Sequence, residues 1–109
     1  MSPAAGPNAI DHIAIPVTDV AAAVEWYTRT FECTVDYQDA TWALLGFANI
    51  RLALVIPEQH PAHIGFVHPH ADRFGSLKLH RDGTRSCYIK DPAGNSVEVL
   101  AADSMPMAK

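Results

Sequence analysis

The chain carries the segment AIDHIAIPV at residues 9–17, and a related segment, PAHIGFVH, follows at residues 61–68. Both segments are rich in apolar residues of the kind that favour β-strands. Each has one histidine near its start, so His12 and His63 occupy equivalent positions in two halves of the sequence. The repeat predicts two tandem copies of one structural module.

The residues around the first segment predict a βαβββ module over residues 9–57. Thr18 or Asp19 would cap a helix whose apolar residues recur at helical spacing as far as Phe31. Short apolar or alternating segments then predict strands at residues 34–37, 41–45 and 50–56.

A proline-rich connection leads into a second module over residues 61–101. After the strand with His63 we expect a short helix within residues 71–77. Strands at 78–80 and 84–90 would flank the hairpin signal Asp82-Gly83, and the last strand would cover 96–100. The predicted fold is α+β: two tandem βαβββ modules form one curled mixed sheet, a cup with helices on its outer face, in a single domain over residues 9–101. Residues 1–8 and 102–109 are predicted to be flexible tails.

Composition and charge exclude several classes of function. The formal net charge of −4 and the scattered lysines and arginines argue against a nucleic-acid partner. No apolar run approaches the ~20 residues of a membrane span, and the N-terminal residues do not resemble a secretion signal. We therefore expect a cytoplasmic protein. A domain of 109 residues has a small core and exposed sheet edges, so we also expect a homodimer.

Strand alternation sorts the side chains, because neighbours along a strand point to opposite faces. His12, His63 and Glu98 each lie opposite the apolar face of their own strand. A carboxylate between valines is costly to bury unless a cation neutralises it, and two imidazoles with one carboxylate suit a divalent metal. The residues expected beneath the helices are Ile13, Ile15, Val17, Ile64, Phe66, Val97 and Val99.

These features resemble the vicinal oxygen chelate superfamily, which includes glyoxalase I, methylmalonyl-CoA epimerase, extradiol dioxygenases, and fosfomycin and bleomycin resistance proteins. The resemblance rests on DHIAI at residues 11–15, Trp26-Tyr27, the repeat at His63, and DPAGN at residues 91–95 followed by Glu98. It implies a metal bound by His12, His63 and Glu98. The alignment puts Ala53 where glyoxalase-type members carry a fourth ligand, so the implied site is a two-histidine, one-carboxylate triad for Fe(II), with Mn(II), Zn(II) or Ni(II) as alternatives.

Among three-ligand members, the extradiol dioxygenases have a motif that this chain matches at His80, Tyr88 and Glu98, together with Asp91-Pro92 and Gly94. Lys78 and Cys87 differ from the residues usual in that motif. The resemblance implies ring cleavage of a small substrate that chelates the metal through two neighbouring oxygens and reacts with O2. Tyr88 would hydrogen-bond the bound oxygens, and His80 would shuttle a proton.

Arg51 lies on the same strand face as Ala53, which makes it a candidate for binding an anionic group of the substrate. The sequence also allows other roles for these residues and other functions. Arg51 could be an ordinary surface arginine, and Tyr88 a tyrosine of the sheet. The same chelate could serve a glyoxalase-like lyase or isomerase, or a fosfomycin-type transferase. A non-catalytic resistance protein that binds a drug or metabolite is the alternative outside enzymes.

Overall fold

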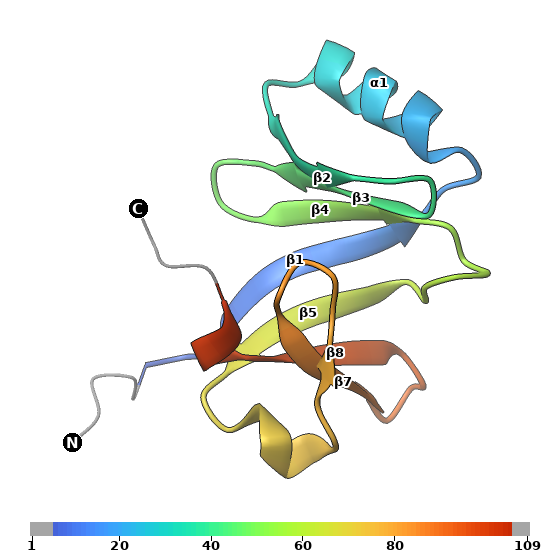
Figure 1. Ribbon diagram of the computed structural model, residues 1–109. Helices are drawn as coiled ribbons and strands as arrows, with labels where there is room; N and C mark the ends of the chain where they lie inside the picture. The colour runs from blue at the N-terminus through green and yellow to red at the C-terminus, as the bar shows by residue number, and fades with distance from the viewer. Residues whose placement is uncertain (1–5, 106–109) are drawn as a thin grey trace. The chain divides into compact units, whose positions relative to one another are not determined.

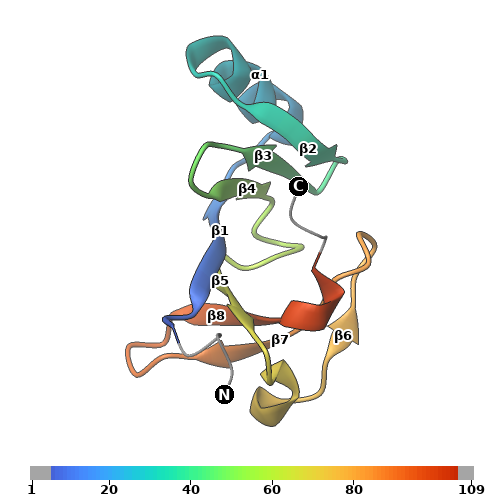
Figure 2. The same ribbon diagram turned by 90° about the vertical axis from the view of Figure 1, so that its left-hand side faces the viewer.

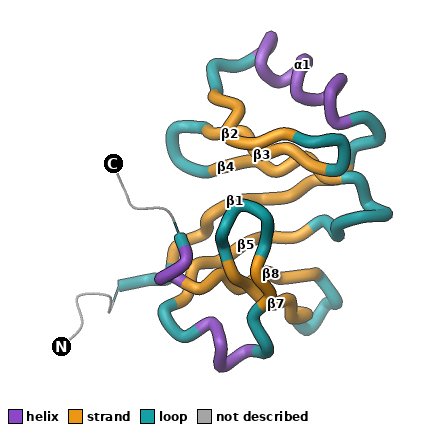
Figure 3. The backbone as a smooth tube through the Cα atoms, in the orientation of Figure 1, coloured by secondary structure: helices purple, strands orange, loops and turns teal. Residues whose placement is uncertain are grey.

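The computed structural model describes residues 6–105, which fall into two compact units. The first unit comprises residues 11–64. The second unit comprises residues 65–105 together with residues 6–10. Figure 1 and Figure 3 show the course of the backbone through both. No helix in residues 6–105 is long and apolar enough to cross a membrane.

The first unit has one helix and four strands, as the sequence predicts for its module. Strand order is β2-β3-β4-β1, with β1 parallel to β4 and the other pairs antiparallel. The elements are β1 (Ala9–Pro16), α1 (Val20–Thr30), β2 (Thr34–Gln38), β3 (Trp42–Gly46) and β4 (Arg51–Val55).

Helix α1 begins where the predicted cap places it. The Asp19 carboxylate accepts a hydrogen bond of 3.0 Å from the Ala22 amide, which satisfies one of the free N–H groups of the first turn. Val20 and Val24 then face the sheet, and α1 packs against β2, β3 and β4 (Figure 1). The buried cluster beneath it consists of Val20, Val24, Ala43, Leu45 and Leu54.

The prediction for Ile13 and Ile64 is wrong. Ile15 and Val17 pack against the cluster under α1 as expected, but Ile13 remains 38% exposed and does not join it. Ile64 is 40% exposed. Alternation fixes the face on which a side chain lies, but it does not fix how far along the strand the covering helix extends.

The second unit contains β5 (His63–His68), whose first two residues are grouped with the first unit, and the strand order is β5-β8-β7-β6. β7 pairs antiparallel with both β6 and β8. The other elements are η2 (Ala71–Phe74), β6 (Lys78–Leu79), β7 (Arg85–Lys90), β8 (Ser96–Ala101) and η3 (Ala102–Ser104). Figure 2 shows β6 beside the long turn that leads into β7.

The expected second helix is a single 3-10 turn, η2, which ends at Phe74 and is followed by Gly75. It lies within the predicted range of residues 71–77. Its buried residue, Ala71, packs with Cys87, Val99 and Ala101. In the predicted C-terminal tail, residues 102–104 form η3, and Ser104 accepts a hydrogen bond from the Arg85 amide. Residues 1–5 and 106–109 of the predicted tails lie outside the described residues.

Candidate metal centre

Two histidines meet within the first unit. His12 on β1 is 8% exposed, and His63, the first residue of β5, is 9% exposed. Their Nε2 atoms lie 2.9 Å apart, and the rings meet edge to face. The repeat in the sequence therefore brings its two equivalent histidines together.

The other ring nitrogen of each histidine has an acceptor. His12 Nδ1 lies 2.8 Å from Asp11 Oδ2, and His63 Nδ1 lies 2.7 Å from the Pro61 carbonyl oxygen. An ionised carboxylate and a carbonyl only accept hydrogen bonds, so each Nδ1 carries the proton. The two Nε2 atoms lie 2.9 Å apart, a separation that a proton shared between the rings or a metal ion bound by both would stabilise. The pair fits a metal ion as a pair of ligands.

Asp11 is itself held by Arg51. Cα pairing between the parallel strands β1 and β4 sets Arg51 beside His12, and Arg51 Nη2 lies 2.9 Å and 2.7 Å from the two Asp11 oxygens. Burial raises the pKa of Asp11, but the hydrogen bonds with His12 and Arg51 outweigh burial and hold the pKa below its usual value. Asp11 is thus an ionised carboxylate that orients the imidazole of His12.

Glu98 occupies an equally specific environment in the second unit. It is 5% exposed on β8, and the Ser86 hydroxyl on β7 donates a hydrogen bond of 2.6 Å to its Oε2 atom. His80 Nε2 lies 2.6 Å from Ser86 Oγ and 3.4 Å from Glu98 Oε2. The carboxylate is therefore positioned by neighbours on the β6–β7 turn and on β7.

Tyr88 lies directly across from Glu98 in the β7–β8 pairing, so both side chains emerge on the same face. Burial of its hydroxyl, the nearby Glu98 charge and a hydrogen bond with Glu98 raise the pKa of Tyr88 well above its usual value. The hydroxyl stays protonated at ordinary pH and can donate, although the residue as a whole is 43% exposed.

By residue type, His12 and His63 of the first unit supply two imidazole nitrogens, and Glu98 of the second unit supplies a carboxylate oxygen; these are donors that divalent transition metals accept. The structure places His80 and Tyr88 beside Glu98, and Arg51 forms an ion pair with Asp11. Sequence reasoning missed Asp11 and Ser86. Strand alternation offered a signal for Ser86, since it shares the β7 face of Tyr88, but nothing in the sequence alone linked it to Glu98.

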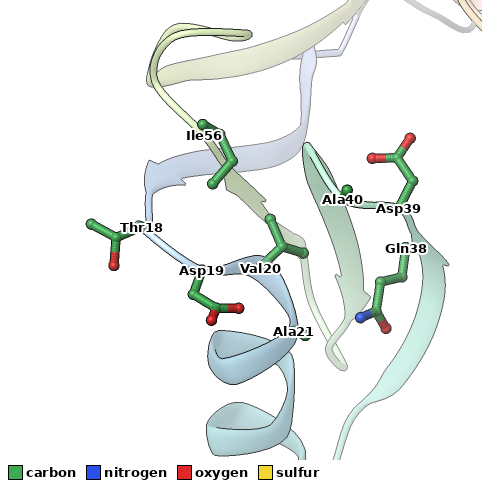
Figure 4. Close-up of a pocket in the computed structure, with 8 residues that line it drawn as sticks. All are labelled: Thr18, Asp19, Val20, Ala21, Gln38, Asp39, Ala40 and Ile56. Carbon is green, nitrogen blue, oxygen red and sulfur yellow. The ribbon is translucent and has the colours of Figure 1, made fainter.

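A pocket lies at the start of α1 in the first unit (Figure 4). Both of its carboxylates have structural partners. Asp19 caps α1, and Asp39 accepts hydrogen bonds from Tyr37, Thr41 and Trp42 in the turn between β2 and β3. None of the predicted site residues lines it; the lining residues are Thr18, Asp19, Val20, Ala21, Gln38, Asp39, Ala40 and Ile56.

A family model described as the Glyoxalase/Bleomycin resistance protein/Dioxygenase superfamily matches residues 9–78. No curated protein matches the sequence. Solved structures with the same fold include a hypothetical protein from Bacillus halodurans C-125, with 13% identity and a TM-score of 0.70 over 95% of this chain and 99% of that one.

A methylmalonyl-CoA epimerase from Streptomyces coelicolor shares 19% identity, with a TM-score of 0.65 over 90% of this chain and 97% of the epimerase. A glyoxalase/bleomycin resistance protein/dioxygenase superfamily member from Vibrio splendidus 12B01 shares 10% identity, with a TM-score of 0.60 over 87% and 99%. At these identities the likeness establishes the fold. The predicted fold class, two tandem modules of the glyoxalase and dioxygenase type, is confirmed.

Proposed function

Since this chain belongs to the glyoxalase/bleomycin resistance protein/dioxygenase superfamily, we propose that it is a metal-dependent enzyme whose His12, His63 and Glu98 bind one divalent ion. We further propose that it is an extradiol-type dioxygenase that cleaves a catechol-like ring. When bound, the metal, which we propose to be Fe(II), supplies an electrophilic centre that two neighbouring substrate oxygens can chelate and that reacts with O2.

The observation that carries this proposal is the approach of the two imidazoles. Both Nδ1 atoms have acceptors, and the two Nε2 atoms lie 2.9 Å apart, a separation that a proton shared between the rings or a metal ion bound by both would stabilise. Ala53, where glyoxalase-type relatives would carry a fourth ligand, offers no donor atom, so His12, His63 and Glu98 would be the residues that hold the metal.

The remaining side chains have defined tasks in this scheme. Asp11, fixed by Arg51, orients His12 and increases its basicity as a ligand. Tyr88, held protonated beside Glu98, donates a hydrogen bond to an oxygen of the bound substrate. His80, whose side chain is 29% exposed, moves a proton between the substrate hydroxyl and solvent. Arg51 holds Asp11 in place, and its contact with an anionic group of the substrate stays a prediction.

The test measures metal content and oxygen uptake on the same protein. We expect one Fe(II) per chain after anaerobic loading, and consumption of O2 with ring-opened product when a panel of catechols is added under air. Glu98→Gln removes the only anionic ligand and should lose both metal and activity. Glu58→Gln makes the same chemical change at an exposed loop position and should lose neither.

The outcomes separate the two parts of the proposal. Wild-type protein that binds no divalent metal would overturn the metal centre. Protein that retains one metal per chain but consumes no O2 with any catechol would overturn the dioxygenase assignment.

A further inference from the structure

We propose that Ser86 is a positioning residue that fixes the orientation of the Glu98 carboxylate for metal binding. The inference rests on the proposed metal site, and every contact behind it lies within the second unit. Ser86 is 1% exposed, and its hydroxyl contacts both Glu98 and His80 at 2.6 Å.

The direction of these two hydrogen bonds follows from the number of protons available. A serine hydroxyl has one hydrogen, and Ser86 donates it to Glu98 Oε2. The contact between His80 Nε2 and Ser86 Oγ must then be donated by the imidazole, so His80 carries its proton on Nε2. The result is a directed chain of donors from His80 through Ser86 to a single oxygen of Glu98.

The hydrogen bond from Ser86 restricts the Glu98 side chain to one orientation. Ser86 on β7 holds Oε2 of a carboxylate that projects from the neighbouring strand β8, and His80 in turn holds the Ser86 hydroxyl. A carboxylate that is already held loses less side-chain freedom when it binds a metal, so outer partners of this kind strengthen metal binding.

Packing alone does not account for a hydroxyl at this position. A buried hydroxyl is costly without partners, and an alanine would fit a fully buried place in a strand at no such cost. The partners of Ser86 among the described contacts are Glu98 and the histidine that the extradiol motif matches. The hydrogen bond with Glu98, rather than packing in the core, therefore accounts for the Ser86 hydroxyl.

The test uses Co(II) alone as the probe, because its visible absorption reports both affinity and coordination. We expect Ser86→Ala to bind Co(II) about 10-fold to 100-fold more weakly, the usual effect of losing an outer partner of a ligand, and to show an altered absorption spectrum. Ser86→Gly removes the same hydroxyl and should give the same spectrum. Ser86→Thr retains the hydroxyl and should restore the wild-type spectrum.

Ser96→Ala is the matched control. Ser96 lies on β8 two residues before Glu98, but its hydroxyl contacts the Lys90 ammonium at 3.0 Å. This variant should bind Co(II) as the wild type does. Circular dichroism of each metal-free variant confirms that it is folded before titration.

Wild-type affinity and spectrum in folded Ser86→Ala would overturn the positioning role while leaving the metal site intact. An equal change in Ser96→Ala would also overturn it. Wild-type protein that fails to bind Co(II) would overturn both this inference and the proposed function.

Discussion

His12 and His63 are oriented by different kinds of partner. Asp11 is a charged acceptor that Arg51 keeps in place, whereas the Pro61 carbonyl is a neutral one. A carboxylate partner makes an imidazole a stronger metal ligand than a carbonyl does. The strength of His12 as a metal ligand therefore depends on a side chain that can be mutated, that of Asp11.

We predict that Asp11→Asn weakens divalent metal binding about 10-fold, because the amide keeps the shape of the side chain but loses its charge. Metal titration of the purified protein measures this. Asp36→Asn makes the same change at an exposed position whose partner is Thr34, and it should leave the affinity unchanged. Equal affinities for both variants and the wild type would contradict the role given to Asp11.

Tyr88→Phe tests the hydroxyl that faces Glu98. The ring and its packing remain, so stability should change little, while turnover should fall about 10²-fold with the loss of a positioned donor. Steady-state kinetics at matched metal content measure this. Unchanged turnover would make Tyr88 a residue of the sheet with no part in the reaction.

At the scale of elements, the turn between β2 and β3 is closed by one carboxylate. Asp39 accepts hydrogen bonds from the Tyr37 hydroxyl, from the Thr41 amide and hydroxyl, and from the Trp42 amide, at 2.6 to 3.0 Å. Burial raises the pKa of Asp39, but these hydrogen bonds dominate and lower it well below its usual value. The folded protein therefore favours the ionised form.

We predict that Asp39→Ala lowers the free energy of unfolding by about 1 to 2 kcal/mol at pH 7, the range found for loss of a capping carboxylate. Because the folded pKa lies below the unfolded one, the stabilisation is present above the unfolded value near ~4 and is lost as pH falls through the folded pKa. Urea unfolding at pH 7 and in strong acid measures the difference. Asp36→Ala, on the preceding strand β2, is the control and should cost less.

At the scale of the whole molecule, several large apolar side chains of the first unit remain in contact with solvent. Trp26 is 47% exposed, Phe31 51% and Val35 46%. A chain of 109 residues buries a limited fraction of its apolar surface, and association would cover more of it. We therefore propose a homodimer. Light scattering at micromolar concentration should report twice the chain mass of 11.8 kDa, and a single-chain mass would refute the proposal.

The amino-acid sequence by itself determined the order of the elements and the candidate ligands. Helical spacing, the Asp19 cap and the alternation of strand residues are local properties, and the repeat marked His12 and His63 as equivalent. The family match and the shared fold confirm the architecture that these local signals predicted.

Only the tertiary structure decided which side chains meet. The pairing of β1 with β4 sets Arg51 against Asp11, and the pairing of β7 with β8 brings Ser86 and Tyr88 to Glu98. Strand register joins residues that are far apart in the chain, and no local periodicity encodes it. For the same reason alternation gave the face of Ile13 but not its exposure, which depends on packing between elements distant in the sequence.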